Sequence, residues 1–263
     1  MLTTNWLLEK LKANSEPCIG TWITLPSPEL VDVICSAGPD FVVIDSEHAP
    51  LSLETAQLMT IVCTSRQVSP VFRVPGAMSD RIVPALEIGS HAIQAPNISS
   101  ANQVEFFVKA SRYSPGGSKG LSPYTKACNY SAEFAGRMTQ TANQNTQLII
   151  QVEGAEGISN IDEILNVPGI DICFLGLYDL SNYLNVPGEL DNPDLLKLFS
   201  ELAKKISDAG IVVGSIASNQ SQLQFLKDAG ARYITYGADC DVVSRAFRNI
   251  FEPNKKINYK NRG

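Results

Sequence analysis

The amino-acid sequence predicts an α/β fold, a single (β/α)8 barrel formed by residues 1–263. Three observations lead to this prediction. Eight short segments rich in β-branched and aromatic residues alternate with segments of helical periodicity, an order that implies parallel strands joined by right-handed crossovers. The chain length is typical of such a barrel. A doubly wound open sheet has the same alternation, but no Gly-x-Gly-x-x-Gly motif follows any predicted strand, so the barrel is favoured.

The second predicted strand is the clearest of the eight. Residues 41–44 read FVVI, a continuous apolar run typical of a strand buried on both faces, and residues 45–48 then read DSEH. Titratable residues at the carboxyl end of a buried parallel strand are where such folds place their chemistry. The predicted strands cover residues 18–23, 41–45, 71–74, 91–95, 147–153, 170–176, 211–214 and 233–236.

Helical periodicity and end signals predict the remaining elements. One amphipathic helix, at residues 5–13, precedes the first strand, and another, at residues 241–250, follows the last. Residues 112–130 form the longest segment without periodicity, and loops of that length in compact domains are usually functional or disordered. We expect residues 253–263 to be a polar tail. The seven helical segments between strands cover residues 28–37, 53–68, 81–88, 101–111, 133–143, 193–209 and 220–229.

Composition excludes several classes of function. An apolar fraction of 44% is sufficient for a large core, and a net charge of −6 without a basic stripe argues against nucleic-acid binding. The first ten residues lack the pattern of a secretory signal, and no apolar run is long enough to span a membrane. The six cysteines form no CxxC pair, so we expect buried, reduced thiols. These features predict a soluble cytoplasmic protein.

Polar residues at the strand ends are the candidates for chemistry, because the strand ends of a barrel converge on one face. Glu153 and Asp179 follow neighbouring strands, and two carboxylates with water and a bidentate substrate can complete the octahedron of Mg²⁺ or Mn²⁺. The alternative is that each carboxylate only caps a helix. The strand-end residues are Trp22, Asp45, Glu47, His48, Arg73, Gln151, Glu153 and Asp179.

Arg73 and the two histidines allow more specific predictions. Arg73 interrupts an apolar strand, where a guanidinium needs an anion. That anion is either a structural partner, Asp45 or Glu87, or a substrate oxygen that gains charge during reaction. His48 fits a general acid–base or water-positioning role. His91 begins a different strand, so we expect it on the opposite, stability face.

Several strings of residues together resemble the HpcH/HpaI family of metal-dependent pyruvate aldolases, over roughly residues 20–243. The most specific are IDSEHAP at residues 44–50 and GLYDLS at residues 176–181. Others are GTW at 20–22, PSP at 26–28, RVP at 73–75 and QVE at 151–153. The resemblance implies a barrel of the phosphoenolpyruvate/pyruvate type, usually assembled as a hexamer with an exchanged C-terminal helix.

The resemblance also implies the chemistry. Glu153 and Asp179 would ligate a divalent metal, either Mg²⁺ or Mn²⁺ with Co²⁺ as a further option, which binds a 2-oxo acid. Arg73 would stabilise the enolate oxygen, and His48 would position a water that moves the proton. The matching partner for that histidine is Glu87, supplied by the same or by a neighbouring subunit. Asp45 would support the site, and substrate contacts would come from Trp22, Gln151, Gly176 and Leu177.

The predicted reaction is the reversible cleavage of a 4-hydroxy-2-oxo acid into pyruvate and an aldehyde. Lys119 replaces the family's usual arginine in a Gly-x-Arg-Gly loop, and Leu177 and Tyr178 replace Pro and Ala or Ser beside the predicted metal site. These departures leave the aldehyde open. Two alternatives remain: a related lyase of acyl-CoA thioesters on the same barrel, and a non-catalytic binding protein whose pocket the loop changes have closed. A phosphate-binding isomerase is disfavoured, because the loops after the last two strands carry few glycines and an acidic residue.

Overall fold

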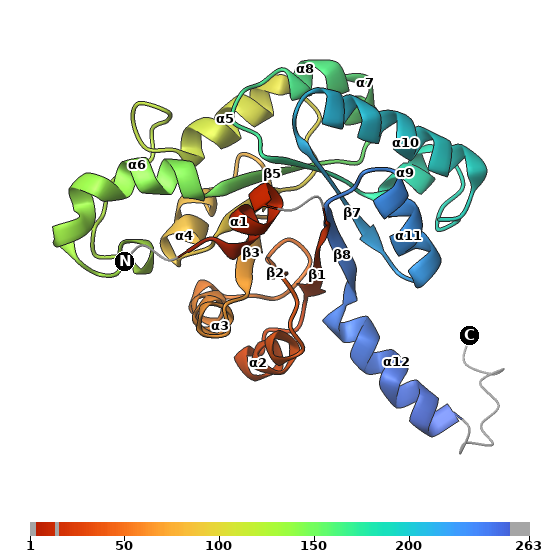
Figure 1. The fold of residues 1–263 in the computed structure, drawn as a ribbon, viewed down its shortest axis with the longest axis horizontal. Coiled ribbons are helices and arrows are strands. Elements are labelled where there is room, and N and C mark those ends of the chain that lie inside the picture. The colour runs from red at the N-terminus through yellow and green to blue at the C-terminus, as the bar shows by residue number, and fades with distance from the viewer. Residues whose placement is uncertain (1–3, 14–15, 253–263) are drawn as a thin grey trace.

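A computed structural model describes residues 4–13 and 16–252 of the chain. Eight parallel strands close into a barrel in sequence order, β1 pairing with both β2 and β8, so the predicted (β/α)8 fold is confirmed. Figure 1 shows the barrel with its helices outside it. The strands are β1 (Cys18–Ile23), β2 (Phe41–Asp45), β3 (Ser69–Arg73), β4 (Ala92–Ala95), β5 (Gln147–Val152), β6 (Ile172–Leu175), β7 (Val212–Ala217) and β8 (Tyr233–Ala238).

The helices follow the predicted order, with two regions of difference. The seven-residue helix α9, directly after β6, is not among the predicted helices. The other difference lies between β5 and β6. The sequence predicts no helix between β5 and β6, and the structure has two there, each of five residues, too short to show periodicity. The helices are α1 (Trp6–Ala13), α2 (Pro28–Ser36), α3 (Leu53–Ser65), α4 (Ile82–Glu87), α5 (Ala101–Ser111), α6 (Ala135–Asn145), α7 (Ala155–Ser159), α8 (Ile161–Leu165), α9 (Leu177–Tyr183), α10 (Pro193–Asp208), α11 (Gln220–Asp228) and α12 (Asp239–Phe251), with short 3₁₀ turns η1 (Lys126–Cys128) and η2 (Ala132–Phe134).

Two apolar layers explain why the strands read as continuous apolar runs. Along β2, Phe41 and Val43 point into the barrel, while Val42 and Ile44 pack against the outer helices. Both sets are fully buried. Inside the barrel, Phe41 stacks on Tyr233 with ring centroids 4.2 Å apart, so aromatic rings fill the interior below the strand ends.

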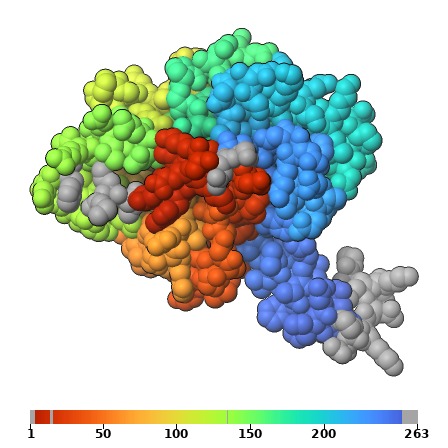
Figure 2. Space-filling model, viewed as in Figure 1, coloured from red at the N-terminus to blue at the C-terminus, as the bar shows by residue number. Residues whose placement is uncertain are grey.

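The amino-terminal end of the barrel is closed by α1. Leu7 and Leu11 of this helix belong to the interior apolar cluster, and the Leu7 N–H donates to Ser69 Oγ at 2.9 Å. Figure 2 shows the red N-terminal residues, which include α1, in the middle of this face of the molecule. His91 lies directly before β4 at this same end, as expected for a residue on the stability face. The opposite end of the barrel remains open for a site.

Two sequence predictions need comment. Five of the six cysteines are buried free thiols, but Cys240 is exposed at the start of α12, so the expectation of buried thiols is wrong for that residue. The predicted polar tail, residues 253–263, lies outside the described residues. None of the helices in the described ranges is long and apolar enough to cross a membrane.

Candidate active site

A pocket of about 400 Å³ lies at the carboxyl ends of the strands, on the face where the sequence predicts the site. It is lined by the ends of the strands and the loops that follow them. Every predicted site residue except Glu87 lies in this lining. The lining residues are Trp22, Thr24, Asp45, Glu47, His48, Arg73, Asn97, Gln151, Glu153, Phe174, Gly176, Leu177, Tyr178, Asp179, Ile216 and Ala238.

Arg73 is held rigidly at one side of this pocket. Its Nε and Nη2 donate to the two carboxylate oxygens of Asp45 at 2.9 and 2.8 Å, a bidentate pair between the ends of adjacent strands. Its Nη1 lies 3.0 Å from Glu47 Oε2, and its guanidinium lies 4.2 Å from the centroid of the Trp22 ring. The predicted partner Asp45 is therefore present, and the other predicted partner, Glu87, is not near Arg73.

Glu153 and Asp179 converge across Gly176 on the other side of the pocket. A side chain at position 176 would place its Cβ 2.8 Å from Glu153 Oε2 and 3.2 Å from Asp179 Oδ2. The space that these two carboxylate oxygens share is therefore open only because residue 176 is glycine. Gly176 also precedes α9, whose first turn carries Asp179. The prediction that the two carboxylates lie close together agrees with this geometry.

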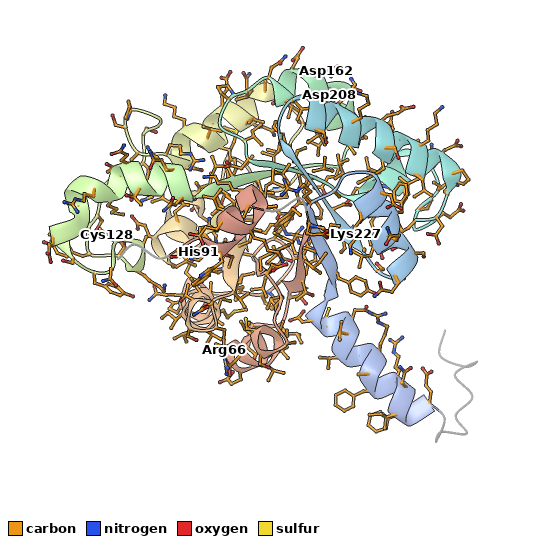
Figure 3. The ribbon with its side chains drawn as sticks, viewed as in Figure 1. Arg66, His91, Cys128, Asp162, Asp208 and Lys227 are labelled. Atoms are coloured by element: carbon orange, nitrogen blue, oxygen red, sulfur yellow. The ribbon has the colours of Figure 1, made fainter. Side chains whose placement is uncertain are left out.

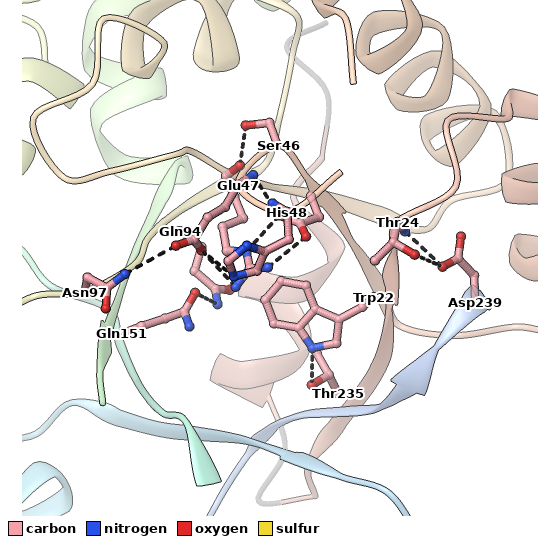
Figure 4. A network of polar contacts seen from close by, with 12 residues as sticks. Trp22, Thr24, Ser46, Glu47, His48, Gln94, Asn97, Gln151, Thr235 and Asp239 are labelled. Atoms are coloured by element: carbon pink, nitrogen blue, oxygen red, sulfur yellow. Dashed lines mark hydrogen bonds and ion pairs between the residues drawn. The ribbon is translucent and has the colours of Figure 1, made fainter. Parts of the chain in front are cut away.

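Hydrogen bonds fix the orientation of the Glu153 carboxylate. Oε1 accepts the backbone N–H of Asn97 at 3.0 Å, and Oε2 accepts the side-chain amide of Gln151 at 3.0 Å. Gln151 in turn accepts from Gln94 at 2.9 Å, and Gln94 accepts from the Tyr233 hydroxyl at 3.1 Å. A chain of buried polar groups thus runs from the barrel interior to Glu153, and Figure 4 shows its link between Gln94 and Gln151.

The charge balance of the pocket is strongly negative. Its described lining carries four carboxylates, with Arg73 and His48 as the basic side chains. Burial raises the pKa of Glu153, and the charges of Asp179 and Glu47 raise it further. Burial is also the main cause of the raised pKa of Glu47, whose Oε2 lies beside the Arg73 guanidinium but accepts no well-aligned hydrogen bond from the described residues. A bound cation would relieve this accumulation of negative charge.

The residues fit a divalent metal with few protein ligands. Within residues 4–13 and 16–252, no group of three or more His, Cys, Asp and Glu side chains is arranged to hold a metal ion. Two carboxylates are nevertheless sufficient for Mg²⁺ or Mn²⁺, which commonly keep several waters and bind the substrate directly. The pair formed by Glu153 and Asp179 matches this donor chemistry.

His48 and Glu87 are not brought together within one chain. The imidazole of His48 lies at the rim, with 70% of its side chain exposed, and its Nε2 is 3.8 Å from Glu47 Oε2. Glu87 lies at the end of α4, where it contacts Lys119 Nζ at 3.5 Å. No contact between Glu87 and His48 is found among the described residues.

Sequence reasoning misses the roles of two residues in the site. Glu47 has the pattern of a helix cap, and the structure pairs it with Arg73 instead. Asn97 bridges the site: its side-chain amide donates to Glu47 at 3.3 Å and its backbone N–H to Glu153. The φ of Asn97 is +52°, a left-handed conformation that asparagine tolerates. An Asn after a strand end is common in sequences, so this pattern does not predict the contacts with Glu47 and Glu153.

Comparison with known proteins adds independent evidence. Residues 18–246 match the HpcH/HpaI aldolase/citrate lyase family. The chain belongs to this family. A hydroxypyruvate/pyruvate aldolase of Roseobacter denitrificans is 29% identical over 92% of this chain and 94% of its own length. A 4-hydroxy-2-oxovalerate aldolase of Novosphingobium aromaticivorans is 32% identical, covering 84% of each chain.

A solved structure agrees with these relatives. The crystal structure of an HpcH/HpaI aldolase/citrate lyase family protein from Burkholderia cenocepacia has a TM-score of 0.87 and 28% identity, over 95% of this chain and 99% of that one. The predictions of family and of a lyase that acts as an aldolase are therefore confirmed. The alternative of a pocket closed by Leu177 and Tyr178 is not supported, because both residues line an open pocket.

Proposed function

We propose that this aldolase reversibly cleaves a short 4-hydroxy-2-oxo acid into pyruvate and an aldehyde, with Glu153 and Asp179 as the ligands of Mg²⁺ or Mn²⁺. The observation that supports these ligands is that oxygens of both carboxylates lie next to the point where any other residue at position 176 would carry its Cβ. The excess of carboxylates around the pocket supports a cation there. A divalent cation bound at this point would supply Lewis acidity toward the carboxylate and keto oxygens of the substrate.

Arg73 would stabilise the oxygen that gains negative charge when the carbon–carbon bond breaks. A guanidinium has five N–H groups, and the contacts with Asp45 and Glu47 use three of them. The remaining donors are available to a substrate oxygen in the pocket. Because Asp45 and the Trp22 ring fix the guanidinium in advance, little reorganisation is needed as charge develops.

His48 would move the proton. Cleavage removes a proton from the 4-hydroxyl group of the substrate and later adds one to C3 of the pyruvate enolate, and one exchangeable base can do both. His48 lies on the pocket rim within reach of water, and Glu47 is its acidic neighbour in this chain. Glu87 would serve as a second acidic partner only if another subunit supplied it.

The aldehyde would bind against Trp22, Leu177 and Tyr178. The Tyr178 hydroxyl lies 3.2 Å from Ser218 Oγ, so the loops after β6 and β7 are joined above the pocket. This bridge narrows the side of the pocket that faces solvent, which favours short aldehydes. Gln151 and Gly176 would contact the 2-oxo acid from below.

The test is exchange of the pyruvate C3 protons for deuterium in D₂O. Enolate formation is shared by every pyruvate aldolase, so the assay needs no knowledge of the aldehyde. We expect exchange that stops with EDTA, returns with Mn²⁺, and is lost in Glu153→Gln. Glu163→Gln is the matched control, since Glu163 lies on α8, outside the pocket lining. Turnover of an acyl-CoA thioester without any pyruvate exchange would instead support the alternative lyase.

We further propose a cytoplasmic homo-oligomer, with the hexamer implied by the family resemblance as the expected state. The support is α12, which extends away from the barrel in Figures 1 and 2. Its side chains Val242, Phe247 and Ile250 are 48%, 52% and 57% exposed in the single chain. An apolar helix face of this kind is suited to burial against another copy. Light scattering coupled to size-exclusion chromatography measures the state directly.

A further inference from the structure

A second cavity, of about 70 Å³, lies at the amino-terminal end of the barrel, away from the candidate active site. It is bounded by the residues that precede β4 and β5, by α6, and by the segment after α5. This segment belongs to the long stretch 112–130 that sequence analysis singled out and that the aldolase site does not use. The volume accommodates roughly two water molecules, at about 30 Å³ each, or one small ligand. The lining is Asn5, Leu86, Gly89, Ser90, His91, Ser111, Tyr113, Lys119, Ala127, Met138, Thr141, Ala142, Asn145 and Thr146.

Two buried polar side chains in this lining have no partner among the described residues. Ser90 is 7% exposed and its Oγ makes no hydrogen bond. His91 is 5% exposed and its Nε2 makes none either. Unpaired buried polar atoms are costly and rare, so two beside one cavity suggest an absent partner. Figure 3 labels His91 and, on the segment that borders the cavity, Cys128.

The hydrogen bonds around His91 make its free nitrogen a donor. Ser69 Oγ already accepts the Leu7 N–H and lies 3.1 Å from His91 Nδ1. Ser69 is fully buried, and among the described residues His91 Nδ1 is the acceptor within reach of its O–H. The tautomer that satisfies this hydroxyl therefore has Nδ1 as the acceptor and the ring proton on Nε2. Burial, with a smaller contribution from Lys126, lowers the pKa of His91 to about 3, so the ring is neutral at physiological pH.

Positive charge accompanies these donors. Lys119 Nζ, with 2% of its side chain exposed, donates to the Tyr113 hydroxyl at 2.7 Å and lies 3.5 Å from both Glu87 Oε1 and the Gly120 carbonyl. No acceptor for the Tyr113 O–H is found in the described part of the chain. Lys126 packs beside Gly89. Within the described residues Lys119 pairs with Glu87 and Lys126 forms no ion pair, so one of the two ammonium groups lacks a counter-ion.

We propose that this cavity is a second small-molecule site that binds a small carboxylate anion, of acetate to pyruvate size. The carboxylate of this anion would accept hydrogen bonds from Ser90, His91 and Lys119. It would thereby provide the partner that Ser90 Oγ and His91 Nε2 lack among the described residues. A short apolar tail would pack against Leu86, Met138 and the alanines of the lining. The site does not depend on a metal, so it is independent of the proposed roles of Glu153 and Asp179.

Equilibrium dialysis with labelled acetate and EDTA-treated protein tests this proposal. We expect one acetate per chain, and binding about tenfold weaker in Ser90→Ala, the usual effect of losing one hydrogen bond to a charged group. Lys119→Met should abolish binding. Lys109→Met is the matched control, because Lys109 is an exposed lysine just before the same segment and does not line the cavity.

Ser90→Ala keeps the test decisive if Lys119→Met fails to fold. Because the Ser90 hydroxyl is unpaired, its removal should leave the melting temperature of the ligand-free protein unchanged or raise it. Acetate should then raise the melting temperature of the parent protein more than that of Ser90→Ala. Three results would overturn the proposal: no acetate binding by the parent protein, equal binding by Ser90→Ala, or binding that is lost in Arg73→Lys and therefore belongs to the aldolase site.

Discussion

Substituting Gly176 by alanine should remove metal binding while leaving the fold intact. The backbone at Gly176 has φ −78° and ψ 100°, which alanine adopts without strain, so the substitution acts only through its added methyl group. That Cβ would lie 2.8 Å from Glu153 Oε2, whereas ordinary contacts begin at 3.4 Å. The carboxylate oxygen must therefore retreat by about 0.6 Å.

A displacement of that size is large for a metal ligand. Mg²⁺ requires near-ideal octahedral geometry with oxygen ligands at about 2.0–2.1 Å, so a shifted Glu153 cannot keep both its own hydrogen bonds and its bond to the metal. Disturbing the surroundings of a ligand typically lowers metal affinity by about 10- to 100-fold. We expect a loss of at least that size in Gly176→Ala. Asp179 Oδ2, 3.2 Å from the same Cβ, would add to the effect.

The assay is titration with Mn²⁺, followed by the loss of the free-ion signal in electron paramagnetic resonance. Gly154→Ala is the matched control, because this glycine directly follows Glu153, has φ −101°, and has no atom within 4 Å of the position that an added methyl group would occupy. Melting curves in EDTA should be similar for both variants. If Gly176→Ala bound Mn²⁺ as tightly as Gly154→Ala, Glu153 and Asp179 would not be the metal ligands.

Three further predictions follow from the same geometry. Asp45→Asn should lower pyruvate exchange by about 100-fold, because Arg73 loses its bidentate anchor. The same substitution should lower the free energy of unfolding in urea by about 3 kcal/mol. Unchanged exchange would contradict the role of Arg73. Without metal, the free energy of unfolding should fall as pH rises above 4.5, because the raised pKa of Glu153 means that the folded state holds more protons than the unfolded chain. Glu153→Gln should flatten this pH dependence in urea titrations. An identical slope in the variant would show that Glu153 is not its cause. Tyr178→Ala removes the bridge to Ser218 and should raise kcat/KM for a bulky aldehyde relative to that for a short aldehyde by about tenfold. An unchanged ratio in steady-state assays would exclude Tyr178 from the aldehyde pocket.

Much of the barrel was predictable, because its signals are local. A strand such as residues 41–45 shows in the sequence that both faces are buried and that its carboxyl end is polar. The order of strands follows from the alternation with helices. The short helices α7 and α8 could not be predicted, since five residues do not complete enough turns to show a period.

The candidate site was predictable only as a set of residues at strand ends. Arg73 and Asp45 pair because the strands that carry them are adjacent and in register, which follows from sequence order once the barrel is assumed. The role of Asn97 was not predictable, because its contacts with Glu47 and Glu153 depend on how one loop crosses the barrel end. The partner of Glu87 was likewise not predictable: within this chain it is Lys119.

The sequence by itself determined the barrel, the face on which the chemistry lies, and most of the residues that line the pocket, because apolar periodicity and strand-end polarity are properties of neighbouring residues. Only the tertiary structure decided that Glu153 and Asp179 share the space above Gly176, and that Ser90, His91 and Lys119 line a separate cavity at the opposite end. Distances between residues far apart in the chain depend on barrel closure and loop path, and no local pattern encodes them.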